Sequence, residues 1–116
     1  MADPEQVFRA QVDAFNARDL DAFLATYAPA AELHGLLPDA VVRGHEAMRA
    51  IYAERFAQEP LHCEIPALAV YGDRWVAAHE RVTSPAGTVE LVGVFEVVDG
   101  RIARADMVRR IPFADD

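Results

Sequence analysis

The sequence predicts a single α+β domain in which three N-terminal helices pack on a curved antiparallel sheet. The chain has 116 residues, a length typical of one domain. Apolar residues recur at helical spacing in the first half, whereas from Leu61 onward they alternate with polar residues at a period of two. Helices followed by hairpin-linked strands favour a segregated α+β fold over a parallel α/β sheet.

Three helices are expected in the first half of the chain. The first begins at Asp3, an N-cap carboxylate followed by proline and an acidic residue. The second begins after Asp19, because four apolar residues follow at i, i+3, i+4 and i+7: Leu20, Phe23, Leu24 and Tyr27. Pro29 is expected to end it. The third follows Gly44, and its apolar face carries Met48, Ile51, Tyr52 and Phe56.

Two short extended segments and four longer strands complete the predicted fold. The short segments span residues 32–37 and 40–43, and the strands span residues 61–71, 74–84, 88–98 and 101–111. Asp99-Gly100 lies between β-branched residues and is a strong hairpin signal. The last four residues, 113–116, are expected to be frayed.

The composition argues against several classes of function. A net charge of −8, from 11 basic and 19 acidic groups, opposes nucleic-acid binding. There is no apolar run long enough to span a membrane and no secretory signal at the N-terminus. The single cysteine, Cys63, suits a reducing compartment and a small core residue, so a cytoplasmic protein is expected. No His or Cys spacing suggests a metal site, and no cofactor is expected.

The longer strands are apolar on more than one side, which bears on assembly. Val76, Ala78 and Val82 lie on one side of their strand, and the next strand carries Val92, Val94 and Val98. A sheet with two apolar faces must cover both. The helices can cover one face, and the sequence predicts that a second copy of the chain covers the other, giving a homodimer.

One strand places polar residues together on a single face: Ala77, His79, Arg81 and Thr83. Buried charge must be paired, so this face is either exposed to solvent or lines a polar part of a pocket. We adopt the pocket interpretation, with His79 as a proton-transfer group and Arg81 polarising an oxygen or fixing an anion. His34, on the first short strand, is a second candidate acid or base.

Two interpretations of Asp106 stay open. It is either a functional acid paired with Arg81 or a histidine, or a surface ion pair with one of its neighbouring arginines, Arg104, Arg109 and Arg110. The substrate-binding wall of the pocket is expected to consist mainly of aromatic and apolar side chains: Phe15, Tyr27, Tyr52, Trp75, Thr83, Phe95 and Met107. Asn16 is expected to cap the end of the first helix.

Four segments, residues 15–23, 27–29, 42–48 and 93–102, together resemble the nuclear transport factor 2-like superfamily. The likeness covers about residues 4 to 110. It implies a cystatin-like α+β barrel, a cone of sheet and helices around one apolar pocket. The superfamily includes ketosteroid isomerases, limonene-type epoxide hydrolases, SnoaL-like polyketide cyclases and non-catalytic domains, so the fold does not choose among them.

The catalytic residues of ketosteroid isomerases are missing from this sequence. Those enzymes use a carboxylate base with an oxyanion hole made by a tyrosine and a protonated aspartic acid. The matching positions here are Gly35, Gln11 and Gly93, so a standard ketosteroid isomerase is not expected. Two supporting tyrosines of that family match Tyr27 and Tyr52.

The other two enzyme groups match in part. Arg81 is similar to the arginine of limonene-type epoxide hydrolases, but Thr83 stands at their first aspartate, and Asp106 lies one residue early for the second. A one-residue shift in a strand reverses the face unless a bulge restores it. SnoaL-like cyclases close rings by metal-free acid–base chemistry, which implies a pocket histidine and aspartate such as His79 and Asp106.

The sequence therefore predicts a cofactor-free enzyme with acid–base chemistry on a largely apolar molecule such as a polyketide or terpenoid. Cyclisation, isomerisation and epoxide opening all fit. A non-catalytic ligand-binding or dimerisation domain of the same fold is the alternative.

Overall fold

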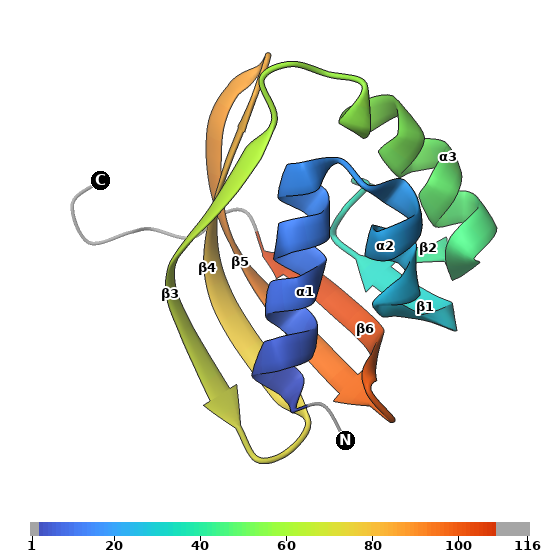
Figure 1. Cartoon of the computed structure of the whole chain (residues 1–116), viewed down its shortest axis with the longest axis vertical. Helices are drawn as coiled ribbons and strands as arrows, with labels where there is room; N and C mark the ends of the chain where they lie inside the picture. Colours follow the sequence, from blue (N-terminus) through green and yellow to red (C-terminus); the bar gives the residue numbers. More distant parts are fainter. Residues whose placement is uncertain (1–2, 109–116) are drawn as a thin grey trace.

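The computed structural model describes residues 3–108 and shows three helices covering one face of a six-stranded curved sheet (Figure 1). The elements in chain order are α1 (Pro4–Ala17), α2 (Leu20–Ala25), β1 (Tyr27–His34), β2 (Val42–Arg43), α3 (Gly44–Phe56), β3 (His62–Tyr71), β4 (Trp75–Ser84), β5 (Gly87–Val98) and β6 (Arg101–Val108). The predicted α+β class is confirmed. None of the helices formed by the described residues is long and apolar enough to cross a membrane.

The sheet is curved but does not close into a barrel. Its strand order is β2-β1-β6-β5-β4-β3, which leaves β2 and β3 at the edges. All neighbouring strands are antiparallel except β1 and β6, which pair in parallel with His34 opposite Asp106. The expected antiparallel sheet therefore contains one parallel pair, which brings the first strand beside the last.

The predicted helix starts at Asp3 and Asp19 are confirmed. The Asp3 side chain accepts a hydrogen bond from the backbone N–H of Gln6 at 2.8 Å, and the Gln6 side chain accepts one from the backbone N–H of Asp3 at 3.2 Å. This reciprocal pair satisfies two backbone donors at the start of α1. Asp19 accepts from the backbone N–H of Ala22 at 3.1 Å and begins α2.

The second helix is shorter than its apolar pattern predicts. It ends at Ala25, and Tyr27 begins β1, a strand that contains Pro29. The cause is tertiary, because the backbone N–H of Ile102 donates to the carbonyl oxygen of Thr26 at 2.8 Å and the following residues join β6. The register of this pairing is irregular between Tyr27 and Glu32, where the ladder passes the proline.

The remaining boundaries agree with the predictions to within a few residues, with two exceptions. The first short segment was expected to begin at residue 32 but belongs to β1, which begins at Tyr27. The second is reduced to Val42–Arg43. Residues 109–111 of the last predicted strand and the tail at 113–116 lie outside the described residues.

The core between helices and sheet is built largely from aromatic rings. Phe23 is fully buried, with its ring centroid 4.5 Å from that of Tyr52, 5.3 Å from that of Tyr27 and 5.4 Å from that of Phe56. Such tilted and edge-on contacts suit the charge distribution of aromatic rings. Phe23 therefore ties α2 to β1 and α3.

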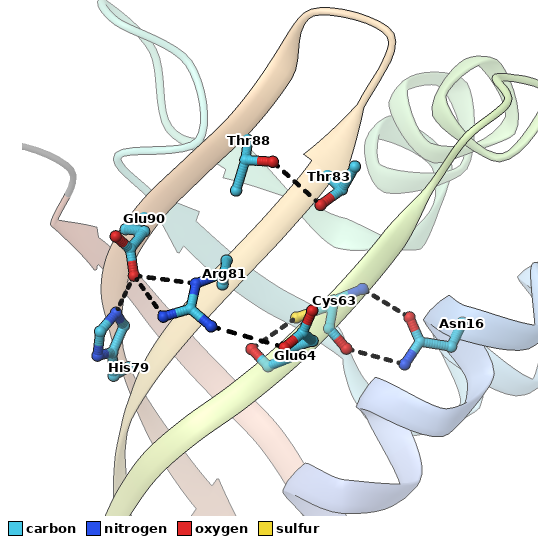
Figure 2. A network of polar contacts seen from close by, with 8 residues as sticks. All are labelled: Asn16, Cys63, Glu64, His79, Arg81, Thr83, Thr88 and Glu90. Carbon is cyan, nitrogen blue, oxygen red and sulfur yellow. Dashed lines mark hydrogen bonds and ion pairs between the residues drawn. The ribbon is translucent and has the colours of Figure 1, made fainter.

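Asn16 does not act as the expected helix cap. Its amide Nδ2 donates to the carbonyl oxygen of Cys63 at 3.0 Å, and its Oδ1 accepts from the backbone N–H of Cys63 at 2.7 Å. Cys63 belongs to the edge strand β3, so the amide replaces the neighbouring strand that an edge lacks. Figure 2 shows this pair joining helix and strand. The interaction fixes the position of α1 on the sheet.

Alternation along β4 separates the two faces of the sheet. The face under the helices carries Val76, Ala78, Glu80 and Val82, and the outer face carries Trp75, Ala77, His79, Arg81 and Thr83. On β5, Val92 and Val94 lie on the outer face as the register partners of His79 and Ala77. The outer face is thus apolar in part and charged in part.

Replacing Asn16 with alanine is expected to lower the free energy of unfolding by about 1–3 kcal/mol, because two half-buried backbone groups lose their partners. Urea unfolding followed by circular dichroism measures the loss. As a control, Thr83→Val removes an exposed side-chain hydrogen bond to Thr88 and should change stability by less than about 0.5 kcal/mol. Equal effects of the two variants would contradict a special role for Asn16.

Candidate functional site

A partly open pocket of about 300 Å³ lies between the helices and the inner face of the sheet. Its walls are mostly apolar and include Val12, Phe15, Leu61, Val82, Leu91 and Met107. Its polar lining includes Gln11, Tyr52, Arg55, Cys63, Glu80 and Ser84. An apolar cavity with a few converging polar groups is the usual form of a small-molecule site.

Glu80 is the carboxylate of this pocket. It extends from the inner face of β4, and only 8% of the residue is exposed. Its Oε1 accepts a hydrogen bond from the thiol Sγ of Cys63 at 3.7 Å. A nearly buried carboxyl group on an otherwise apolar strand face is costly to desolvate, and such groups gather at functional sites.

Gly93 makes room for Glu80. A Cβ atom built on Gly93 would lie 2.5 Å from Oε2 of Glu80 and 2.6 Å from Cε1 of Phe95. Gly93 is also the position at which the isomerase resemblance expects the acidic hydrogen-bond donor. The carboxyl group of Glu80 therefore occupies the space of a side chain at position 93, but it comes from the neighbouring strand.

Cys63 contributes a hydrogen-bond donor to the pocket. Burial raises the pKa of its thiol, and the nearby carboxylate of Glu80 raises that pKa further. The thiol therefore stays protonated and donates a hydrogen bond to Glu80, while the Asn16 amide binds the Cys63 backbone. A protonated thiol is a poor nucleophile, so the arrangement suits positioning of Glu80.

Gln11 and Tyr27 form a polar layer beside Glu80. Tyr27 is fully buried, and burial raises the pKa of its hydroxyl well above the usual value, with smaller contributions from Tyr52 and Glu80. Gln11 is 7% exposed and lines the pocket, and its Oε1 has no hydrogen-bond partner among the described residues. This oxygen is available to a donor on a bound molecule.

The expected placement of His79, Arg81 and Thr83 in the pocket is wrong. They lie on the outer face of β4, because the next residue along the alternation, Glu80, faces inward. Figure 2 shows Glu90 between His79 and Arg81. His79 Nε2 donates to Glu90 Oε1 at 2.8 Å, and Arg81 Nε donates to the same oxygen at 3.3 Å.

This outer-face cluster is a network of paired charges. The hydrogen bond from His79 and the charge of Arg81 lower the pKa of Glu90. Arg81 also lies 3.6 Å from Glu64 of β3. The face is half exposed, so solvent and these carboxylates satisfy the charges that pattern analysis assigned to the pocket.

His34 and Asp106 also lie on the outer face and outside the pocket lining. His34 Nε2 is 3.0 Å from Glu32. Asp106 accepts two hydrogen bonds from Arg104, at 2.8 and 3.0 Å, which lower the pKa of its carboxyl group. Of the two interpretations of Asp106, the structure shows the surface ion pair.

The expected substrate-binding residues divide into three groups. Phe15, Tyr52 and Met107 line the pocket, and their role in binding stays a prediction. Tyr27 and Phe95 are fully buried in the core and do not belong to the lining. Trp75 and Thr83 lie on the outer face.

Pattern analysis missed six polar pocket residues: Gln11, Arg55, Gln58, Cys63, Glu80 and Ser84. The available signal for Glu80 was its position as the single acid among Val76, Ala78 and Val82 on one strand face. The described residues contain no group of three His, Cys, Asp or Glu side chains placed to hold a metal ion.

Solved structures from several bacteria share this fold. A SnoaL-like protein of unknown function from Burkholderia thailandensis is 30% identical, with a TM-score of 0.75 over 92% of this chain and 93% of that one. An uncharacterized cystatin fold protein from Novosphingobium aromaticivorans is 24% identical, with a TM-score of 0.81 over 94% and 100%.

The epoxide hydrolase/cyclase-like enzyme SalBIII, which has a role in pyran ring formation in the polyether salinomycin, also superposes. It is 17% identical, with a TM-score of 0.81 over 92% of this chain and 90% of that one, a likeness that shows the fold alone. No curated protein sequence matches the chain. The family model of the SnoaL-like domain matches residues 8–105. The chain therefore belongs to the SnoaL-like domain family.

Proposed function

We propose that this protein is a cofactor-free enzyme that performs acid–base chemistry on a small, largely apolar molecule, with Glu80 as the proton-transfer group. The carrying observation is the carboxyl group of Glu80, 8% exposed and facing an apolar pocket. The reaction class is cyclisation, isomerisation or epoxide opening, and polyketides and terpenoids are the substrate class that fits the walls.

The surroundings of Glu80 suit proton transfer. Burial disfavours the charged form of a carboxyl group, and a general acid or base is most effective when its two protonation states are close in free energy at the working pH. The Cys63 thiol donates a hydrogen bond to the carboxyl group, which fits in the space left by the missing side chain of Gly93. Exclusion of water by the apolar walls strengthens electrostatic interactions with a bound substrate.

A ligand-binding domain without chemistry is the competing candidate. It is favoured by one observation, that Glu80 is the sole carboxylate among the described residues lining the pocket, whereas many acid–base sites pair two titratable groups with different roles. If the protein is an enzyme, removing the proton-transfer capacity of Glu80 changes turnover. If it is a binding domain, the same change can affect only binding.

Glu80→Gln is expected to abolish base catalysis while leaving the shape of the pocket intact. The test uses 5-nitrobenzisoxazole, an apolar compound that loses its C3 proton to a base as its N–O bond breaks, giving a coloured nitrile phenolate. Because a positioned general base contributes about 10²–10⁴-fold, the variant should lose about that factor in rate, followed by absorbance.

The matched control is Glu90→Gln, which neutralises a carboxylate on the opposite face of the same sheet. It should keep the rate of the unchanged protein. Wild-type and Glu80→Gln proteins with equal rates would contradict the assignment of Glu80. Unchanged affinity for the compound in a variant without turnover separates loss of chemistry from loss of the pocket.

Gly93→Ala is expected to reduce the same rate and to lower the free energy of unfolding by about 1–3 kcal/mol, as overpacking does. The new methyl group must displace Glu80 or Phe95. In a Glu80→Ala background the clash with the carboxyl group is absent, so the cost in stability should be smaller. Urea unfolding of the four proteins measures the difference, and an equal cost in both backgrounds would show that Gly93 does not position Glu80.

We also propose that two copies of the chain pair through the outer face of the sheet. This face carries an apolar group on neighbouring strands, Trp75, Ala77, Val92 and Val94. Cation and carboxylate pairs flank it on the same face, from Arg81 and Glu90 to Arg104 and Asp106. A mixed surface of this kind is complementary to a second copy of itself.

Val94→Lys should convert a dimer to a monomer, because the two-fold pairing brings two desolvated ammonium groups together. Sedimentation velocity at micromolar concentration reports the change. Val70→Lys, at a valine that is 40% exposed and is the register partner of Val76 on the inner face of the sheet, should leave the dimer intact. A wild-type protein that sediments as a monomer would rule out the interface.

A further inference from the structure

The pocket is lined by a cationic side chain, Arg55, as well as by the carboxylate of Glu80, and the two residues belong to different elements. Arg55 belongs to the last turn of α3 and is half buried among the lining residues, with Gln58 beside it at the end of the helix. Glu80 comes from β4. The two charges therefore line one cavity from the helix layer and from the sheet.

Arg55 differs from most arginines of this acidic protein. Within residues 3–108, seven arginines lie in ion pairs with carboxylates: Arg9, Arg18, Arg43, Arg49, Arg74, Arg81 and Arg104. Arg55 and Arg101 make no such pair in this part of the chain, and of these two Arg55 lines the pocket. A partly desolvated guanidinium without a carboxylate partner is an electrostatic site for an anion.

The guanidinium of Arg55 is held in place by an aromatic ring. Its Cζ lies 5.7 Å from the centroid of the Tyr52 ring, a cation–π distance. Tyr52 itself is buried, with its ring centroid 4.5 Å from that of Phe23. A side chain stacked on a fixed ring loses less conformational freedom when it binds a ligand.

We propose that Arg55 binds a carboxylate on the substrate, so that the substrate class is an apolar molecule with one acidic end. The inference rests on the proposed function of the same pocket. A single guanidinium compensates one negative charge and matches the planar fork of a carboxylate, whereas a dianionic phosphate would leave one charge uncompensated. The carboxylate at Arg55 keeps the negative end apart from the carboxyl group of Glu80, toward which the apolar body of the molecule extends.

The experiment compares two non-reacting probes of equal chain length, decanoate and decan-1-ol, by isothermal titration calorimetry. The unchanged protein should bind decanoate at least about tenfold more tightly, because a hydrogen bond to a charged group is worth about that factor. Arg55→Gln should lose this preference and keep its affinity for decan-1-ol. Arg49→Gln removes the same charge from the same helix at an exposed ion pair with Asp21 and should keep the preference.

Three results would each overturn the proposal: no measurable binding of decanoate to the unchanged protein, equal affinity for both probes, or an unchanged preference in Arg55→Gln. A thermal melt of each variant confirms that it is folded. Since neither probe reacts, these outcomes do not depend on turnover. Failure of the Glu80 assignment would instead appear in the rates with 5-nitrobenzisoxazole while the decanoate preference remained.

Discussion

The double hydrogen bond between the Asn16 amide and the backbone of Cys63 is the interaction on which the pocket depends. It joins the end of α1 to the unpaired edge of β3, so one side chain fixes the spacing between helix layer and sheet. Cys63 in turn meets Glu80 on the next strand. A displacement of α1 would therefore pass through backbone hydrogen bonds directly to the pocket carboxyl group.

The two faces of the sheet manage charge in different ways. On the outer face, His79 and Arg81 donate hydrogen bonds to Glu90, and all three side chains are partly exposed to solvent. Such exposed pairs have a small desolvation cost and contribute little to stability. On the inner face, Glu80 is in contact with the Cys63 thiol and is only slightly exposed to solvent. A carboxyl group retained in such a place lowers stability relative to an apolar side chain, which is typical of a residue kept for function.

Local signals predicted much of the fold, and non-local pairing explains the rest. The caps at Asp3 and Asp19 and the hairpin at Asp99-Gly100 depend on neighbours within a few residues, so their positions could be predicted. The end of α2 depends on Ile102, far along the chain, which is why Tyr27 moved from helix to strand. The prediction of the site residues failed for a related reason. Alternation separates the two faces of a strand but does not say which face the helices cover. That face determines whether His79 or Glu80 lies in the pocket.

The parallel pairing of β1 with β6 places a constraint on how the protein is made. Tyr27 pairs with Ile102 and Leu33 pairs with Ala105, so the bonds between β1 and β6 form only after nearly the whole described chain has left the ribosome, whereas β1 can pair with β2 earlier. Loop closure over such a separation is slow compared with hairpin formation. Until β6 has been synthesised, β1 lacks its neighbouring strand on that side, and an unpaired strand edge in a partly folded chain favours aggregation.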